Sequence, residues 1–330
     1  MKVPEKQTQK SEGSSSGFCV FYIGMFKIIL YYQIEQKQLK KLVKYVKINN
    51  VINKEENMKR IVSIQDISCL GKCSETVALP IISSMGVETA ILPTSILSNH
   101  TAFSSYTFKS LADEIYRIIE EWKKQKFQFD LIYIGYTGNT EILDLVLYFI
   151  KEFKTENNIV VFDPAMADHG QMYAGINESV LEKMKELCKI ADYIKPNLTE
   201  SALLLGKEYK KDYSIEEIEG LARELKELGT KNVIITGVEK DGKMGAIGYD
   251  GGKYCSNFET KYDASYHGTG DVFTSALSGS LVKGKTLEEA IKIATKFTTE
   301  CVRLTYEDIN GTKYGVNFEE AIPYLLKLIL

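Results

Sequence analysis

Apolar residues from position 58 onward fall into two kinds of segment that alternate along the chain. Short continuous apolar runs are typical of buried strands, and runs with apolar residues every three or four positions are typical of helices. The runs predict strands at 61–65, 87–93, 131–135, 159–162, 193–195 and 233–236. The helical spacing predicts helices at 76–85, 108–126, 141–153, 180–190, 198–205, 215–228, 272–282 and 287–305.

This alternation predicts an α/β fold with a mostly parallel central sheet covered by helices on both faces, as three α/β/α layers. Glycines and alternating residues at 242–255 suggest antiparallel hairpins at one side of the sheet. The helices at 272–282 and 287–305 are expected to close the chain. Neither a linker nor a repeat interrupts the pattern, so we expect residues 58–330 to form one domain.

The first 57 residues differ from the rest of the chain. Residues 1–16 are polar and rich in serine, 17–34 are mostly apolar, and 35–57 are rich in Lys, Gln and Asn. The apolar stretch is short for a membrane span and contains Lys27, and no small-residue cleavage site clearly follows it. We therefore expect residues 1–57 to be an extension outside the fold, with Met58 as an alternative start, in preference to a membrane span or a targeting signal.

The composition is that of a soluble globular protein, with 44% hydrophobic and 26% charged residues. The net charge is −3, but residues 1–57 carry +5 and residues 58–330 carry −8. An acidic body argues against a nucleic-acid surface. The six cysteines are scattered, which is typical of reduced thiols in the cytoplasm. Cys69 and Cys73 are one pair with no second pair beside them, which disfavours a zinc site.

Polar side chains gather where the predicted strands end. In a parallel sheet these carboxyl ends share one edge, which is where ligands bind. All three histidines lie in these loops or in the glycine-rich turn near position 268. We therefore expect a site at this edge, and the residues that follow the strands are Asp66, Asn99, His100, Thr101, Tyr136, Asp163, Asp168, Asn197, Glu200 and Thr236.

The stretch Gly268-Thr269-Gly270-Asp271 precedes an apolar helical segment. Two glycines allow a sharp turn close to a ligand, and the free amides of the following helix favour an anion such as phosphate. A carboxylate there is either the helix N-cap or a base that takes a proton from an attacking hydroxyl. The phosphate-loop and dinucleotide motifs are both absent from the sequence. Carboxylates at Asp163, Asp168 and Glu200 are candidates to hold Mg²⁺.

These residues carry a resemblance to a known family. Gly268-Thr269-Gly270-Asp271 at the start of a late helix resembles the catalytic motif of the ribokinase-like superfamily. Across essentially residues 58–330, further segments are similar in order and spacing to pyridoxal (pyridoxamine) kinases: Ile64-Gln65-Asp66, Ser98-Asn99-His100-Thr101, Gly135-Tyr136, Asp163-Pro164 with Asp168, and Lys195-Pro196-Asn197-Leu198-Thr199-Glu200. The segment at 98–101 is the more specific to the vitamin B6 branch.

The resemblance implies a role for each matching residue. Asp271 would be the base that activates the 5′-hydroxyl of a vitamin B6 compound, and the amides of Gly268, Thr269 and Gly270 would hold the transferring phosphoryl group. The implied substrate pocket contains Asp66, Thr101 and Tyr136. The implied ATP and Mg²⁺ residues are Asp163, Asp168, Tyr173, Asn197, Glu200 and Thr236, with Asp163 and Glu200 nearest the metal.

Two departures leave the substrate open. Asp66 stands where many pyridoxal kinases have serine, and His267 before the turn is equally similar to hydroxymethylpyrimidine kinases. The second hypothesis is therefore a hydroxymethylpyrimidine kinase, and the third is a B6-binding protein that has lost catalysis, which the intact motif argues against. The resemblance also implies ATP as co-substrate, Mg²⁺, a possible monovalent cation and a homodimer acting on small molecules, without nucleic acid or membrane partners.

Overall fold

The computed structural model describes residues 58–309 and 314–330, except residue 174. The expectations for residues 1–57 therefore lie outside the described residues. Within the described part, no helix is both long enough and apolar enough to span a bilayer.

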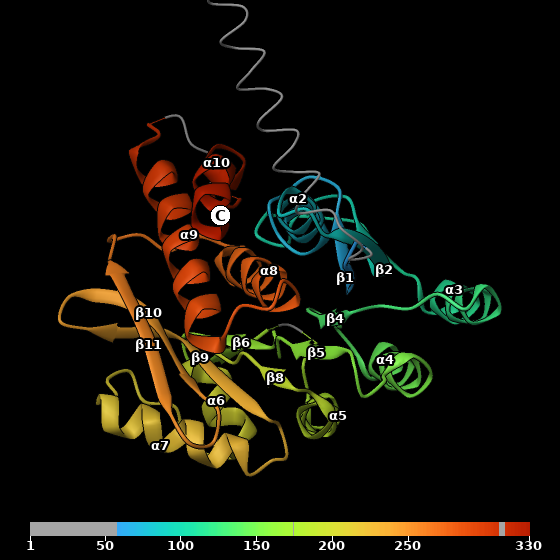
Figure 1. Cartoon of the computed structure of the whole chain (residues 1–330), viewed down its shortest axis with the longest axis horizontal. Coiled ribbons are helices and arrows are strands. Elements are labelled where there is room, and N and C mark those ends of the chain that lie inside the picture. Colours follow the sequence, from blue (N-terminus) through green and yellow to red (C-terminus); the bar gives the residue numbers. More distant parts are fainter. Residues whose placement is uncertain (1–57, 174, 310–313) are drawn as a thin grey trace, which may run out of the picture. The chain divides into compact units, whose positions relative to one another are not determined.

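A large sheet forms the centre of the domain (Figure 1). Its strands, in spatial order, are β11 (Tyr254–Thr260), β10 (Lys243–Tyr249), β9 (Asn232–Lys240), β8 (Tyr193–Ile194), β5 (Ile159–Phe162), β4 (Leu131–Ile134), β1 (Arg60–Ser68), β2 (Glu88–Leu97) and β3 (Phe108–Ser110). The pairs from β9 to β2 are parallel, whereas β3, β10 and β11 join by antiparallel pairing. The predicted α/β class with a mostly parallel sheet is confirmed.

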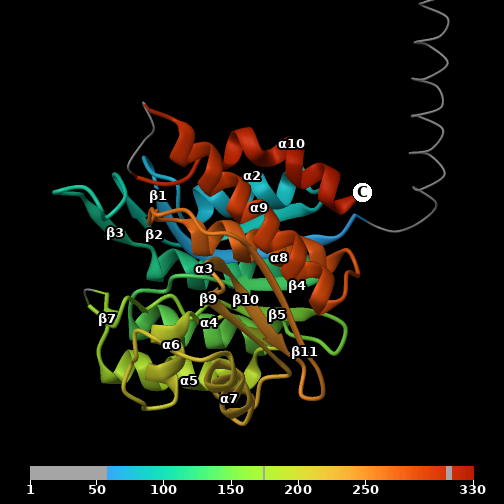
Figure 2. The ribbon, with the colours of Figure 1, turned by 90° about the vertical axis from the view of Figure 1, so that its left-hand side faces the viewer.

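Helices cover both faces of the sheet, as Figures 1 and 2 show from two directions. One face packs against α3 (Ala112–Gln125), α4 (Thr140–Phe153), α5 (Glu178–Ile190), α6 (Leu198–Leu204) and α7 (Ile215–Lys226). The other face packs against α2 (Glu75–Ser84), α8 (Thr269–Val282), α9 (Leu287–Glu307) and α10 (Phe318–Ile329).

The strands between these layers alternate between the two cores, because successive side chains of a strand point to opposite faces. Val62 and Ile64 of β1 lie in the core with α3 to α7, and Ile61 lies in the core with α2 and α8 to α10. Ser63 and Gln65 share the face of Ile61, so the α2 and α8 side of the sheet carries a buried polar stripe towards the carboxyl ends of the strands.

The structure corrects three expectations. Asp66 lies within β1, which runs on to Ser68 after its register with β2 shifts, and not in a loop. The segment 108–110 is not the start of a helix, because it pairs as β3 with the end of β2. A further helix, α10, follows the two that were expected to close the chain. Its internal Pro323 weakens a helical pattern in sequence, but the apolar side chains of α10 have a buried site against α9 and α2.

The hairpin of β10 and β11 sets the direction in which the chain reaches α8. Strand β9 points to the carboxyl edge of the parallel strands, β10 returns, and β11 points to that edge again. Residues 261–268 then lead directly into α8, whose N-terminus therefore lies at the ligand-binding edge. A small two-stranded sheet of β6 (Ala167–Asp168) and β7 (Gln171–Met172) lies along the loop after β5.

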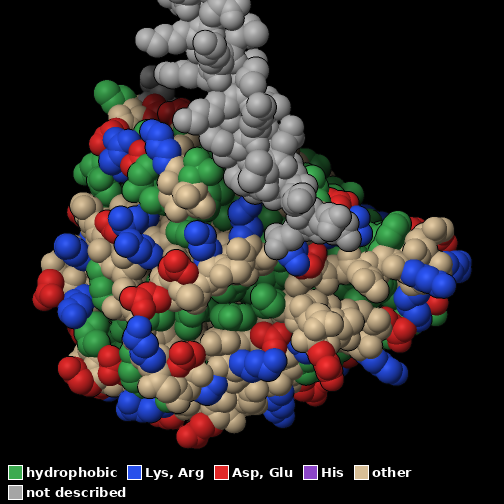
Figure 3. Space-filling model, in the orientation of Figure 1, with side chains coloured by type: hydrophobic (Ala, Val, Ile, Leu, Met, Phe, Trp, Pro, Cys, Tyr) green, Lys and Arg blue, Asp and Glu red, His purple; other side chains and the backbone are tan. Residues whose placement is uncertain are grey.

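Charged side chains of both signs are interspersed on the face in Figure 3. On the described part of that face the basic side chains form no continuous patch.

Candidate active site

The glycine-rich turn forms the N-terminus of α8. Gly268 is the N-cap residue with φ of 78°, in the left-handed region that favours glycine. A Cβ on Gly268 would lie 2.0 Å from the carbonyl oxygen of Lys72, so only glycine allows the two backbones to approach so closely. The first amides of α8 have no partner within the helix and add to its positive dipole end. This turn has the properties of an anion-binding site.

Asp271 occupies the third position of α8 and is not its N-cap, since Gly268 takes that place. Its Oδ2 accepts a hydrogen bond of 2.9 Å from the amide of Ser74, in the loop before α2. Burial raises the pKa of Asp271 to about 7, and the charges of Asp163 and Asp66 add to the shift, while the Ser74 amide and Lys195 oppose it. A carboxyl with such a pKa can accept a proton near neutral pH.

Asp66 and Asp271 both bond to Ser74. Asp66 is buried in β1 and accepts hydrogen bonds from the hydroxyls of Ser74, at 2.6 Å, and of Ser68, at 3.3 Å. Burial raises its pKa, and these hydroxyls oppose the shift. Glu75, the first residue of α2, is a third buried carboxyl in this region, and neither of its oxygens accepts a hydrogen bond within the described part of the chain.

Lys195 and Asp163 form a buried ion pair beneath the turn. The Lys195 Nζ lies 2.9 Å from Asp163 Oδ2, and both side chains are less than 6% exposed. The same oxygen accepts a hydrogen bond of 2.8 Å from Thr274 of α8, which ties β5 to the helix that carries Asp271. A Cβ on Gly270 would lie 3.5 Å from Lys195 Nζ, so the ammonium group lies against the turn. The site therefore contains a fixed positive charge beside the anion-binding amides.

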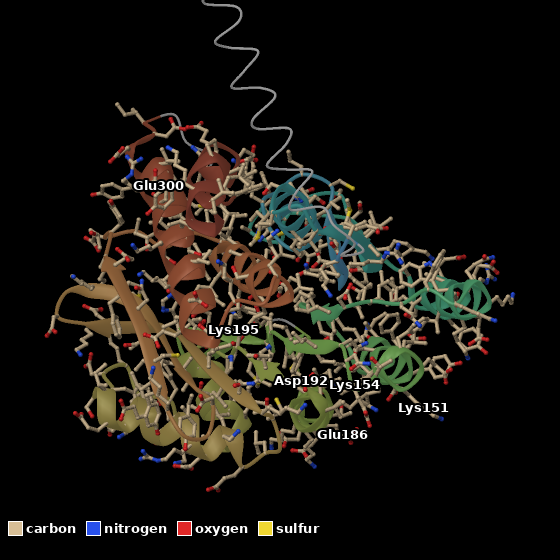
Figure 4. The ribbon with its side chains drawn as sticks, viewed as in Figure 1. Lys151, Lys154, Glu186, Asp192, Lys195 and Glu300 are labelled. Carbon is tan, nitrogen blue, oxygen red and sulfur yellow. The ribbon has the colours of Figure 1, made fainter. Side chains whose placement is uncertain are left out.

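Lys195 had no role among the expectations drawn from the sequence. The sequence feature that could have indicated a role is the position of this lysine, directly after the apolar run of β8 and before Pro196. Although burial alone would lower its pKa, the charges of Asp163 and Glu200 raise it, so the group stays protonated. Figure 4 labels both ends of β8: Lys195 lies towards the centre of the domain, and Asp192 lies near Lys154 at the opposite end, where the two form an ion pair.

Asn197 and Glu200 lock the start of α6. The Asn197 side chain accepts from the Glu200 amide, and Glu200 Oε2 accepts from the Asn197 amide, which is a complete capping box. Glu200 Oε1 accepts from the Met166 amide in the loop after β5. Thr236 pairs with Asn197 as an isolated bridge beside this cap. These contacts bring three predicted residues together and show that Glu200 also holds the loop.

Of the other predicted substrate residues, Tyr136 lies close enough to Asp66 to sense its charge. Tyr136 follows β4 and is partly buried, and burial together with the charge of Asp66 raises its pKa. Thr101 is exposed after β2, next to the buried His100. The rings of His100 and His267 lie with centroids 4.8 Å apart, so the loop after β2 contacts the glycine-rich turn. Burial, with the second imidazole, lowers the pKa of His100 to about 4.

Two predicted residues lie at the rim of this region. The Asp168 side chain is 51% exposed in β6 and accepts from the amide of His169. Tyr173, just after β7, is also exposed, and its amide donates to the carbonyl of Met166. Both remain predictions as nucleotide contacts.

The carboxylates of Asp163 and Glu200 suit a magnesium ion whose remaining ligands are phosphate oxygens and water. Asp163 Oδ2 is engaged by Lys195 and Thr274, which leaves Oδ1 open, and both Glu200 oxygens already accept from amides. Direct contact through Asp163 and contact through water from Glu200 are therefore compatible with the donor set, because Mg²⁺ usually takes one or two carboxylates and retains water and phosphate ligands. Among the described residues, no group of three or more His, Cys, Asp or Glu side chains is placed to hold a metal ion alone.

A comparison with protein families places the chain in a class of small-molecule kinases. The family model described as phosphomethylpyrimidine kinase matches residues 79–317. The chain belongs to this family. The resemblance to the ribokinase-like kinases is thereby confirmed.

Individual relatives divide between two substrates. A hydroxymethylpyrimidine/phosphomethylpyrimidine kinase of Aquifex aeolicus is 32% identical over 188 residues, covering 56% of this chain and 69% of the relative. A pyridoxal kinase of Dictyostelium discoideum is 27% identical over 290 residues, covering 82% of this chain and 93% of the relative.

Solved structures show the same division. A crystal structure described as a phosphomethylpyrimidine kinase from Bacteroides thetaiotaomicron, in a form with pyridoxal, is 38% identical with a TM-score of 0.78 and covers 82% of this chain and 96% of its own. A pyridoxal kinase from Lactobacillus plantarum is 26% identical with a TM-score of 0.76, covering 82% of this chain and 98% of its own.

Proposed function

We propose that the chain is an ATP-dependent kinase that phosphorylates the 5′-hydroxymethyl group of pyridoxal, pyridoxamine or pyridoxine. The observation that carries the proposal is Asp271, a buried carboxyl with a pKa of about 7 at the start of an anion-binding helix. A phosphate site alone explains the amides and Lys195. A basic carboxyl among them has a use only if a hydroxyl must lose a proton there.

In the proposed reaction the oxygen of the substrate hydroxyl forms a bond to the γ-phosphorus of ATP, and Asp271 accepts the proton that this hydroxyl loses. The bond from that phosphorus to the bridging oxygen breaks, and ADP leaves with its electron pair. The amides of Gly268, Thr269 and Gly270 and the Lys195 ammonium would stabilise the charge on the transferring group. Asp163, and Glu200 through water, would hold Mg²⁺, which supplies further charge neutralisation at the phosphates. Asn197, Thr236, Asp168 and Tyr173 are proposed as nucleotide contacts.

Asp66 favours a pyridine substrate with a hydrogen-bond donor on its ring. It is a buried carboxylate that shares the hydrogen-bond donor residue Ser74 with Asp271, and an ionised carboxylate can only accept hydrogen bonds. A protonated ring nitrogen satisfies it. Tyr136 and Thr101 would complete the pocket. The relative crystallised with pyridoxal supports this assignment, since it shares 38% of its sequence with the chain.

The second candidate is phosphorylation of hydroxymethylpyrimidine. It is supported by the family description and by the Aquifex relative. The resemblance of the segment at His267 to hydroxymethylpyrimidine kinases points the same way. In either case we propose that the protein acts as a cytoplasmic homodimer on small molecules, with Mg²⁺ and possibly a monovalent cation. These attributes rest on the resemblance to ribokinase-like enzymes.

A substrate panel separates the candidates. Initial rates with ATP and Mg²⁺ are measured for pyridoxal, pyridoxamine, pyridoxine and hydroxymethylpyrimidine, and the phosphorylated products are identified by mass. We expect at least one B6 compound to have a kcat/KM about tenfold above that of the pyrimidine, or about 1.4 kcal/mol of discrimination. The reverse preference favours the second candidate. If none of the four compounds increases the rate of ATP consumption, the protein is a binding protein without this activity.

A further inference from the structure

Ser74 has an unusual backbone conformation for its position. It is the N-cap residue of α2, with φ of 50° and ψ of −130°. Among the described residues three other non-glycine residues have positive φ, namely Lys126, His169 and Asp241, and all three are exposed, whereas Ser74 is 5% exposed. Such a conformation costs a non-glycine residue about 1–3 kcal/mol, which glycine would largely avoid.

The Ser74 hydroxyl does not perform the ordinary task of an N-cap serine. It makes no hydrogen bond to the amides of its own helix. Instead it donates to Asp66 Oδ1 at 2.6 Å, while the Ser74 amide donates to Asp271 Oδ2 at 2.9 Å. One residue therefore bonds to both the carboxyl proposed as the base and the carboxyl proposed to face the substrate ring. The strained backbone is what directs its two donors to these carboxyls.

We propose that Ser74 is a positioning residue that sets the placement of the ring-facing carboxylate relative to the base, and thereby the affinity for the heterocyclic substrate. The inference rests on the proposed function and extends it. Of the two side-chain hydrogen bonds that Asp66 accepts, the one from the Ser74 hydroxyl is the stronger, since it is 2.6 Å long and the one from Ser68 is 3.3 Å long. Without it, Asp66 would lose a charge-assisted bond that favours its ionised form and fixes its orientation.

Several titratable groups face Asp66. They are Asp271 on α8, Glu75 on α2, Cys73 in the preceding loop and Tyr136 after β4. Each is an acid, so their ionised forms disfavour a negative charge on Asp66, and Ser74 and Ser68 are the side chains that oppose this. Removing the Ser74 hydroxyl is therefore expected to raise the pKa of Asp66. Protonation of Asp66 weakens substrate binding, so in the variant this weakening should begin at a higher pH than in the wild-type protein.

The test compares Ser74→Ala and Ser74→Gly in the full chain. Both variants lose the hydroxyl and keep the amide bond to Asp271, but only glycine relieves the backbone strain. Pyridoxal binding without ATP is followed by its near-ultraviolet absorbance from about pH 5.5 to pH 8.5, and kcat and KM are measured with ATP. Because every variant meets the same ligand, the titration of pyridoxal itself cancels from the comparison.

We expect both variants to bind pyridoxal about tenfold more weakly, with KM raised similarly and kcat changed less than about threefold. Ser74→Ala is expected to be less stable than Ser74→Gly. An equal loss of binding in the two variants would therefore show that the missing hydroxyl, and not the backbone strain, weakens binding. In an Asp66→Asn background, Ser74→Ala should alter Kd by less than about twofold, since its partner is already changed. Ser214→Ala, at the exposed N-cap of α7, is the control that loses a cap and keeps Kd.

Unchanged Kd and pH dependence in both Ser74 variants would overturn the inference, as would the same tenfold loss in the Asp66→Asn background. A loss that is confined to kcat would show a purely structural effect on the base and would also overturn it. The wild-type protein is measured first on the four-substrate panel. Activity there with normal binding by the Ser74 variants refutes only the role of Ser74, whereas no activity and no pyridoxal binding refutes the proposed function together with this role.

Discussion

Asp271 derives its basicity from burial, which raises its pKa to about 7. Only the ionised carboxylate can accept the substrate proton, so kcat/KM with the preferred substrate should fall as the pH drops through about 7 and level off above it. Initial rates between about pH 5.5 and pH 8.5 test this.

Asp271→Asn is expected to lower turnover by about 10²–10⁴-fold and to remove that part of the pH dependence, with binding largely kept. Asp241→Asn, on the exposed turn between β9 and β10, serves as a control with normal rates. Near-normal turnover of Asp271→Asn contradicts its assignment as the base.

We expect Glu75 to destabilise the folded chain at neutral pH. Burial raises its pKa well above the ordinary value, and the charges of Asp66 and Asp271 add to the shift; the nearby Ser63 side chain opposes it, but within the described part of the chain it makes no hydrogen bond to either Glu75 oxygen. The folded state therefore binds a proton that the unfolded state releases above about pH 4.5, and stability falls as the pH rises from there.

Glu75→Leu should therefore raise the free energy of unfolding at neutral pH. The relieved cost of an unpaired buried polar group, about 1–3 kcal/mol, exceeds the favourable helix N-terminus contribution of about 0.3–1 kcal/mol. Urea unfolding at pH 7 and at about pH 4 measures the effect, and the gain should shrink at the lower pH. A variant that is less stable at pH 7 would mean that the Glu75 carboxyl is held by a favourable contact.

At the level of elements, the close contact between the start of α8 and the loop before α2 sets the geometry of the anion-binding turn. Gly268→Ala would place Cβ 2.0 Å from the Lys72 carbonyl oxygen in a backbone conformation that disfavours alanine. We expect kcat to fall by at least about 10²-fold, because a displacement of about 1 Å at the reacting groups has that effect.

Gly242→Ala is the matched control for this variant. Gly242 also has positive φ, at 71°, but a Cβ there would meet nothing within 4 Å. It should cost about 1–2 kcal/mol of stability and leave kcat unchanged. Equal kcat values for the two variants would mean that the contact with Lys72 does not position the turn.

The sequence predicted the elements that periodicity defines and missed those that tertiary contacts decide. The apolar runs of β4 and β5 and the helical spacing of α4, α5 and α9 identified these elements closely, whereas β1 was found but predicted too short. Strand β3 could not be predicted, because 108–110 is a strand only through its pairing with β2. Helix α10 carries a proline, and its stability depends on packing against α9.

In the candidate site, too, some residues could be predicted from the sequence pattern and others depend on tertiary contacts. The residues at the strand ends were predictable because a parallel sheet gathers them at one edge. Lys195 could not be assigned a role, since its pairing with Asp163 joins β8 to β5 and no local pattern records it. Ser74 was also missed: its neighbours Asp66 and Asp271 are eight and 197 positions away along the chain.

At the scale of the whole molecule, every residue proposed for the site lies between Asp66 and Asp271. Among the described residues, the two hydrophobic cores likewise begin with Ile61. We therefore predict that a chain of residues 58–330 folds and keeps kcat/KM within about twofold of the full chain. Circular dichroism, thermal unfolding and the substrate panel test this, and a truncated chain that is folded but inactive contradicts it.

The order in which the layers are completed has a consequence for synthesis on the ribosome. Strand β4 emerges early, yet the face that carries Leu131 and Tyr133 packs into a core with α8, α9 and α10, which are translated last. A nascent chain that stops before residue 269 would expose this apolar face and would lack the base as well. Such chains are expected to need chaperones and to aggregate when they are released prematurely. This face of β4 is made early and is covered late.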